Sequence, residues 1–134
     1  MVLFEAPYLH LEYYAAHDVL VSQWYGRCTS REYRDALERF MHYVDSMNIQ
    51  YAISDRRLLP PLSEEDAHWT TEVFLESFRK LPLKRFAIIK SFSSSAGKQL
   101  QDFIRNKQHP LPFEAKAFND LTSAYDWLTA TEAA

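Results

Sequence analysis

A chain of 134 residues with 47% hydrophobic and 25% charged side chains has the composition of one globular domain. Its 15 basic and 18 acidic residues give a net charge of -3, which argues against nucleic acid or an anionic membrane as a general partner, because both select a basic surface. Only two glycines are present, Gly26 and Gly97, so neither a phosphate-binding loop nor a dinucleotide-binding fingerprint can be built, and no cofactor is expected.

The first half of the chain predicts an antiparallel pair of strands followed by a helix. Aromatic and β-branched residues fill 8–14 and 18–25, and the connection between them is short enough for a hairpin. Thr29 and Glu32 then form a capping box at the start of a helix. Beyond it, apolar residues recur at intervals of three and four, as on a helix packed against a sheet: Tyr33, Ala36, Leu37, Phe40, Met41, Val44 and Met47.

The second half predicts strands that alternate with helices. Residues 49–54 follow the first helix almost without a loop, which indicates a crossover between parallel strands. Ser63 caps a second helix that runs to about Lys80, where Leu81-Pro82 ends it. A strand at 84–90, a helix within 93–106, an outer strand at 113–118 and a final helix capped by Asp120 complete the order. The expected fold is α/β: a single domain with an ordered core at about 8–130, a mixed sheet of about five strands, about four helices and a frayed tail at 131–134.

The segment "YAISD", a strand that ends in an acid, is followed by a loop and the hydroxyl-capped helix of "PLSEED". With the element order over about 8–130, this resembles the STAS superfamily, in its SpoIIAA-like and SEC14-like branch, the fold of bacterial anti-sigma-factor antagonists. The resemblance implies a regulatory domain that docks a protein partner through this loop and helix start, with phosphorylation at the position of Ser63. Here Glu64, Glu65 and Asp66 follow that serine and repel a phosphate, so docking is expected more than a phosphorylation switch.

The dipeptide Arg56-Arg57, directly after Asp55, has two interpretations, which are equally supported. Two adjacent arginines beside a helix start converge donors on one point, as an anion or partner site at the carboxyl edge of a sheet requires. Alternatively, Asp55 accepts loop N–H groups, and one arginine pairs with an acid of the helix start. We expect at least one of the arginines to project to solvent beside Trp69, on a shallow surface rather than over a deep pocket.

Two tryptophans are assigned to the same edge of the sheet. Trp24 ends the second predicted strand, and Trp69 lies in the first turns of the second predicted helix. Trp69 and Val73 fall outside the apolar stripe of that helix, which favours an interface and a possible homodimer. The alternative is that both indoles only cover the open end of the core.

Residues suited to catalysis or to metal binding form no recognisable constellation. Glu64 and His68 share a helix face, but no second histidine lies near them, so no metal site is expected. Cys28 lies beside a helix N-terminus, which lowers a thiol pKa, yet no base is assigned to it, so a structural thiol is expected. No catalytic residue is therefore assigned, and the chain is not expected to be an enzyme.

Two functional hypotheses follow. The first is a non-enzymatic interaction module that docks an unidentified protein through Asp55, Arg56, Arg57, Ser63, Glu64, Trp69 and Trp24. The second is a domain of SEC14-like type that binds a small apolar, lipid-like ligand, although so short a chain would struggle to enclose a lipid. A cytoplasmic location is expected because a lone cysteine cannot form an internal disulfide, and no membrane insertion is expected because no apolar run approaches about 20 residues.

Overall fold

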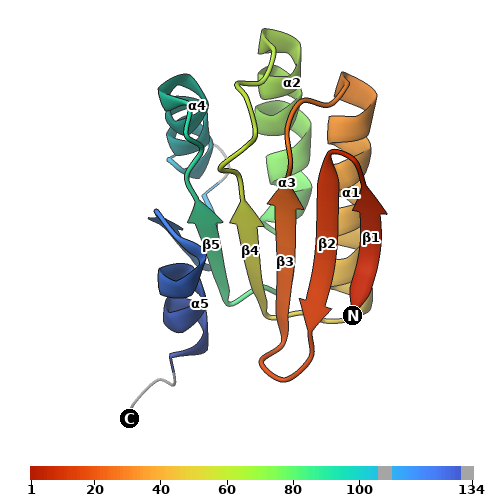
Figure 1. The fold of residues 1–134 in the computed structure, drawn as a ribbon, viewed down its shortest axis with the longest axis vertical. Coiled ribbons are helices and arrows are strands. Elements are labelled where there is room, and N and C mark those ends of the chain that lie inside the picture. Colours follow the sequence, from red (N-terminus) through yellow and green to blue (C-terminus); the bar gives the residue numbers. More distant parts are fainter. Residues whose placement is uncertain (106–109, 131–134) are drawn as a thin grey trace.

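The computed structural model describes residues 1–105 and 110–130, and the expected frayed tail lies outside them. Within these ranges, six strands form one sheet with helices on both faces (Figure 1). The elements, in chain order, are β1 (Val2–Ala6), β2 (Leu9–Tyr14), β3 (Val19–Trp24), α1 (Ser30–Ser46), β4 (Tyr51–Asp55), α2 (Glu64–Trp69), the π-helical segment η1 (Thr70–Phe74), α3 (Leu75–Phe78), β5 (Arg85–Ile89), α4 (Ser94–Ile104), β6 (Glu114–Phe118) and α5 (Leu121–Thr129). No helix in the described ranges has the length and apolar character needed to cross a membrane.

The sheet is mixed, and its strands lie side by side in chain order. The pairs β1–β2 and β2–β3 are antiparallel, whereas β3–β4, β4–β5 and β5–β6 are parallel and are connected through helices. The predicted α/β fold, with a hairpin followed by parallel strands, is therefore confirmed.

Strand β1 was not expected from the sequence. It is a five-residue edge strand that pairs with β2 across an irregularity between Val2 and Phe4. The hydroxyl of Tyr43, on α1, donates to the Leu3 carbonyl at 3.1 Å and ties the strand to the helix layer. The strand escaped prediction because Val2, Leu3 and Phe4 are consecutive apolar residues without the alternation of a half-buried strand.

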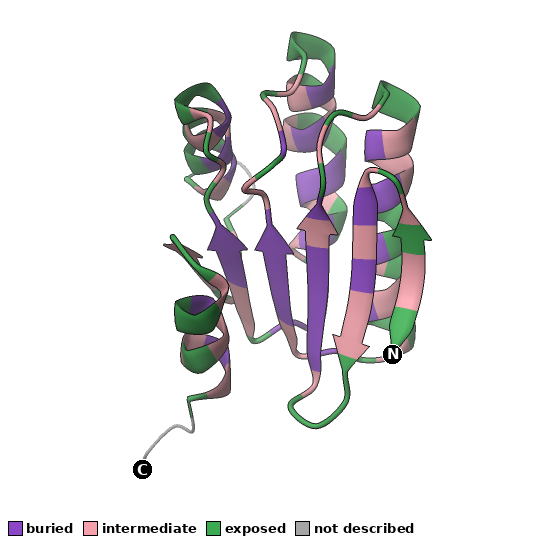
Figure 2. Ribbon diagram, in the orientation of Figure 1, coloured by how far each residue is buried: buried purple, intermediate pink, exposed green. Residues whose placement is uncertain are grey.

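Alternating side chains of the strands point to opposite faces of the sheet and pack into two separate hydrophobic cores. Leu20, Ala52 and Ile88 face the layer made by α1, η1, α3 and α4, whereas Val19 and Ile53 face α5 on the other side. Figure 2 shows β3, β4 and β5 as the most completely buried strands. The central strands are thus packed on both faces, as the sequence of 84–90 indicated.

The predicted helix caps are all present. The Thr29 hydroxyl accepts from the Glu32 N–H at 3.1 Å, and the Glu32 carboxylate accepts from the Thr29 N–H at 2.9 Å. The Ser63 hydroxyl accepts from the Asp66 N–H at 3.1 Å, and Asp120 caps α5. These side chains satisfy N–H groups that would otherwise have no partner at the helix starts.

The second predicted helix is interrupted by the π-helical turn η1. A π turn inserts one extra residue, so positions five apart come to lie on the same face. Trp69 and Phe74 accordingly stack with ring centroids 6.2 Å apart, and Trp69 is half-buried. The apolar outer stripe expected on this helix is therefore reduced to the exposed Val73, and the homodimer stays a prediction with less support.

Asp18, directly before β3, links this strand to β2 and to the start of β4. Its contribution to stability is the first testable prediction. Its backbone is left-handed, with φ at 58°, and its carboxylate accepts from the Tyr13 hydroxyl at 2.7 Å and from the Gln50 N–H at 3.0 Å. Asp18→Ala should lower the free energy of unfolding by about 3 kcal/mol, because it removes two bonds to a charged acceptor and strains the backbone.

Asp18→Asn should cost roughly half as much, because asparagine tolerates the left-handed conformation and keeps one acceptor oxygen. Asp18→Gly separates the two causes, since it relieves the backbone but loses both bonds. Urea unfolding of the three variants measures these differences. Equal stability of Asp18→Ala and the unaltered protein would show that the carboxylate does not hold the strands together.

Candidate functional site

The face of the sheet under α1, η1, α3 and α4 becomes polar toward the carboxyl ends of β3 and β4. Ser22 and Ser54 are paired in the parallel register of these strands. Two residues further on come Trp24, which ends β3, and Arg56, which directly follows β4. All four side chains line one cavity beneath the helices, because positions two apart share a face of a sheet.

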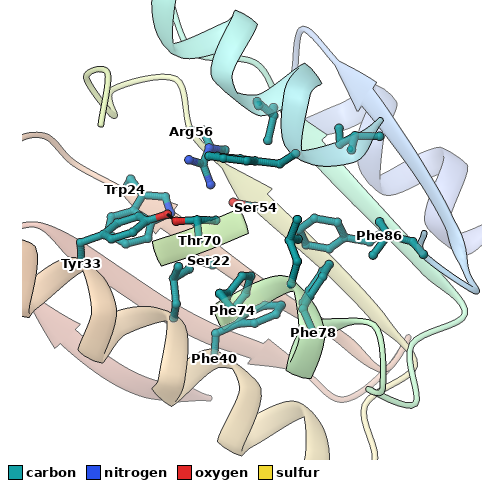
Figure 3. Close-up of a pocket in the computed structure, with 16 residues that line it drawn as sticks. Ser22, Trp24, Tyr33, Phe40, Ser54, Arg56, Thr70, Phe74, Phe78 and Phe86 are labelled. Carbon is teal, nitrogen blue, oxygen red and sulfur yellow. Dashed lines mark hydrogen bonds between the residues drawn. The ribbon is translucent and has the colours of Figure 1, made fainter. Parts of the chain in front are cut away.

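This cavity has a volume of about 60 Å³ and lies between the sheet and the helix layer (Figure 3). Its walls are apolar and come from α1, η1, α3, β5 and α4. The aromatic side chains of the wall are Tyr33, Phe40, Phe74, Phe78, Phe86 and Phe103. Among the described residues that line the cavity there is no aspartate, glutamate, histidine, lysine or cysteine, so Arg56 is the one charged side chain.

The hydroxyls of Ser22 and Ser54 are unpaired within the part of the chain that the structure describes. The two residues are only 5% and 6% exposed, yet neither hydroxyl has a hydrogen-bond partner there. Among the described residues, the buried side-chain polar atoms without a partner are limited to Nδ1 of His10, so the two serine hydroxyl oxygens keep accessible surface at the cavity. They are therefore open to hydrogen bonds from a bound molecule or from water.

Tyr33 and Thr70 close the polar end of the cavity. Their hydroxyl oxygens are 2.7 Å apart, and the Thr70 hydroxyl also approaches the Asp66 carbonyl at 2.8 Å. Since the carbonyl can only accept, Thr70 donates to Asp66 and Tyr33 donates to Thr70. Burial raises the pKa of Tyr33, so this proton stays in place at neutral pH.

Arg56 brings a positive charge to the cavity. Its backbone is fixed by two bonds: its N–H donates to the carbonyl of Ile89, at the end of β5, at 3.0 Å, and its carbonyl accepts from the N–H of Leu59, in its own loop, at 3.1 Å. The side chain is half-buried, and no carboxylate of the described residues forms an ion pair with it. Figure 3 shows Arg56 near Trp24, Tyr33 and Ser54 at the polar end of the cavity.

Arg57 points the other way and is neutralised. Its Nε and Nη2 donate to the two carboxylate oxygens of Asp55 at 3.0 Å and 2.7 Å, a bidentate pair that raises the pKa of Arg57. Asp55 itself is buried. The expectation that Arg56 and Arg57 converge on one point is therefore wrong, because adjacent residues at a strand end face opposite sides of the sheet.

The arginine beside Trp69 is Arg34, from α1. Its guanidinium lies 5.2 Å from the centre of the indole and pairs with Asp66 at 3.3 Å and with Glu65 at 3.5 Å. This corrects two expectations: neither Arg56 nor Arg57 takes that place, and neither bridges to the acids of the helix start. The cause is the packing of α1 along α2, which sequence patterns of single elements do not reveal.

The remaining residues assigned to docking divide into buried and exposed groups. Trp24 is buried against Tyr33, with ring centroids 5.7 Å apart, so it cannot contact a partner directly; the same holds for Asp55. Ser63 and Glu64 are exposed at the start of α2. A docking surface on this edge would therefore use only the exposed part of the expected set.

Two exposed apolar residues at the same edge were missed by sequence reasoning. Leu58 is 53% exposed, and Phe92 is 77% exposed. They belong to the loops after β4 and β5, which are joined by a bond from the Phe92 N–H to the Arg57 carbonyl at 3.0 Å. The pairing of Ser22 with Ser54 was missed too, although a serine at an inward position of an apolar strand is a readable signal.

The pKa of Cys28 shifts in the direction opposite to the expected one. Burial, together with the negative charges of Glu32 and Asp66, raises the pKa of Cys28 to about 11. The expectation that the helix start lowers this pKa is wrong, because desolvation dominates. Within the described ranges, no three histidine, cysteine, aspartate or glutamate side chains are grouped as metal ligands.

Comparison with solved structures finds the crystal structure of an uncharacterized protein of the DUF3478 family, with a SpoIIAA-like fold, from Shewanella loihica PV-4. The two chains superpose with a TM-score of 0.60 and 24% sequence identity, over 90% of this chain and 91% of the other. No protein-family model matches the sequence, and no curated protein is detectably similar to it. The likeness establishes a SpoIIAA-like fold and confirms the expected architecture, while the function has to be argued from the site.

The reactivity of Cys28 gives the second test. Because it is the only cysteine, alkylation of the folded protein by iodoacetamide reports on this thiol alone. The rate should be low at pH 7 and should rise with pH toward a midpoint near 11, where the thiolate forms. Mass spectrometry of timed samples measures the rate, and Cys28→Ser gives the background. A midpoint at or below pH 8.5 would contradict the assignment.

Proposed function

We propose that this domain is a non-enzymatic binding module that holds a small apolar ligand in the cavity between the sheet and the helix layer. The observation that carries the proposal is the pair of unpaired hydroxyls, Ser22 and Ser54, aimed into an otherwise apolar space. Parallel α/β sheets bind ligands at the carboxyl ends of their strands, which is where this cavity lies.

The size of the cavity limits the ligand. An engineered apolar cavity of roughly 150 Å³ holds benzene, and the volume here is about 60 Å³. A long-chain lipid does not fit such a space, so a lipid-carrier role is not part of the proposal. The expectation of a small apolar ligand is kept, and the lipid-like part of it is set aside.

The lining supports binding without turnover. General acid–base catalysis needs a group that titrates near neutral pH, and among the described lining residues only Tyr33 and Arg56 are ionisable. Tyr33 keeps its proton because burial raises its pKa, and an arginine stays charged. Among the described lining residues, neither serine has a base beside it that could make it a nucleophile.

A protein-docking function at the carboxyl edge is a second candidate. The observation that favours it is the exposure of Leu58 and Phe92 on loops that are hydrogen-bonded to each other. Ser63 and Glu64 lie exposed at the start of α2, after the first of these loops. Phosphorylation of Ser63 stays a prediction, opposed by the adjacent carboxylates. The lone cysteine supports a cytoplasmic setting for such a partner.

Xenon binding tests the cavity proposal, because xenon enters dry apolar cavities. Xenon under pressure should shift the amide NMR signals of residues around the cavity, notably Phe78 and Phe86. Leu100→Phe fills part of the space and should abolish these shifts, whereas Val73→Phe, on the exposed side of η1, should leave them intact. The absence of any shift in the unaltered protein would refute an accessible cavity.

The docking candidate is tested by capture of proteins from a native lysate. A partner that binds the carboxyl edge should be retained by the unaltered protein and lost with the double variant Leu58→Glu/Phe92→Glu, because charge replaces its apolar contacts. Val73→Glu introduces a charge at an equally exposed apolar position and should retain the partner. Identical retained proteins for all three would exclude docking at this edge.

A further inference from the structure

We infer that the ligand of this cavity is a short-chain carboxylate, whose carboxylate group binds Arg56 and the hydroxyls of Ser22 and Ser54. The inference rests on the proposed binding function and revises its ligand from a wholly apolar molecule to one with an apolar tail and one negative charge. It follows from three properties of the lining: its charge, its hydrogen-bond donors and its volume.

The charge of the lining selects a monoanion. Arg56 is the one charged side chain among the described lining residues, and no carboxylate of the described chain neutralises it. In a poorly solvated site a charge requires a partner of opposite sign, so the bound molecule should supply one negative charge. A phosphate carries more negative charge than a single arginine balances. A carboxylate matches a guanidinium in both charge and planar geometry.

The donors of the lining suit the same head group. Ser22 and Ser54 lie side by side on parallel strands, which are spaced about 4.8 Å apart, so their two hydroxyls can approach the same small group. The Tyr33 hydroxyl adds no donor of its own, because its proton is already donated to Thr70, and its oxygen interacts with the Arg56 guanidinium. The serine hydroxyls and the guanidinium together provide donors to two acceptor oxygens. A carboxylate is therefore held at the polar end of the cavity, with its hydrocarbon part toward Phe78 and Phe86 (Figure 3).

The volume sets the length of the hydrocarbon part. The six carbon atoms of benzene occupy an engineered cavity of roughly 150 Å³, so a space of about 60 Å³ accepts about two or three carbon atoms. With the carboxylate at the polar end beside the half-buried Arg56, we expect a hydrocarbon part of about two or three carbon atoms, as in propionate and butyrate. Acetate leaves the apolar wall uncovered, and decanoate exceeds the cavity.

An NMR titration of the full-length protein tests the inference with four probes: butyrate, butyramide, acetate and decanoate. Butyrate should shift the amide signals of Ser22, Ser54 and Phe86 in a saturable manner. Butyramide has nearly the same shape without the charge and should bind about tenfold more weakly or worse. Acetate and decanoate should both bind more weakly than butyrate. Equal affinity for butyrate and butyramide would overturn the assignment of an anion site.

The variant Arg56→Gln should lower the affinity for butyrate about tenfold or more and remove the preference over butyramide. Arg31→Gln makes the same charge change at an exposed position of α1 and should bind butyrate normally. Unchanged butyrate affinity in Arg56→Gln would overturn the role of this arginine. Folding of both variants is checked by their amide spectra without ligand.

The double variant Ser22→Ala/Ser54→Ala distinguishes binding hydroxyls from structural ones. It should bind butyrate more weakly while its midpoint of urea unfolding stays equal or rises, because these hydroxyls make no hydrogen bond within the described part of the chain that the substitution would remove. A lower midpoint would show that the hydroxyls serve the fold and would contradict the inference.

The same samples separate failure of this inference from failure of the proposed function. If xenon enters the cavity and none of the carboxylates shifts its residues, the ligand assignment is wrong and the cavity proposal stands. If neither xenon nor butyrate produces shifts, both are wrong.

Discussion

One buried carboxylate, Asp66, holds α2 against α1, one of the helices that line the cavity. It accepts from the Ser30 hydroxyl at 2.7 Å and from the Arg34 guanidinium at 3.3 Å, both on α1. Its backbone N–H is capped by Ser63, and its carbonyl accepts from Thr70. A buried charge is tolerated only when it is paired and hydrogen-bonded, so these contacts fix α2 against α1 in one arrangement. The position of Thr70, and through it the orientation of the Tyr33 hydroxyl, depends on this arrangement.

The cavity is a packing defect, because a protein interior is normally packed as densely as an organic crystal. At roughly 24 cal/mol per Å³, a void of 60 Å³ costs about 1.4 kcal/mol of stability. Ser22 and Ser54 place two hydroxyls on its wall that have no hydrogen-bond partner in the described part of the chain. The π turn at Thr70–Phe74 is a further local departure, of a kind that is frequent at functional sites. The cavity, the hydroxyls on its wall and the π turn beside it meet at one place, which a binding role explains better than imperfect packing.

Most of the fold could be predicted from interactions between residues that are close in sequence. The site could not, because it depends on which side of the sheet each side chain faces. The capping box at Thr29 and the apolar stripe of α1 involve neighbours in sequence, and both were predicted. The π turn and β1 were not, because neither carries a distinct pattern of propensity or periodicity. The segment 55–69 was correctly identified as chemically unusual but was assigned to an outer surface. Successive residues along a strand face opposite sides of the sheet. Ser54 and Arg56 therefore face the cavity, while Asp55 and Arg57 pair on the opposite side.

The two candidate functions share the backbone around Arg56. Its N–H is bonded to Ile89, at the end of β5, and its carbonyl to Leu59, in the loop that carries Leu58. The Leu59 carbonyl in turn accepts from the Ser91 hydroxyl at 2.8 Å, beside Phe92. The residue that brings charge to the cavity is therefore bonded to the end of β5 and to the loop that exposes Leu58. A ligand shifts a conformational equilibrium only through contacts that differ between states. Arg56 both lines the cavity and is hydrogen-bonded to the backbone at the edge, so the proposed ligand binding and the proposed partner docking are compatible with each other.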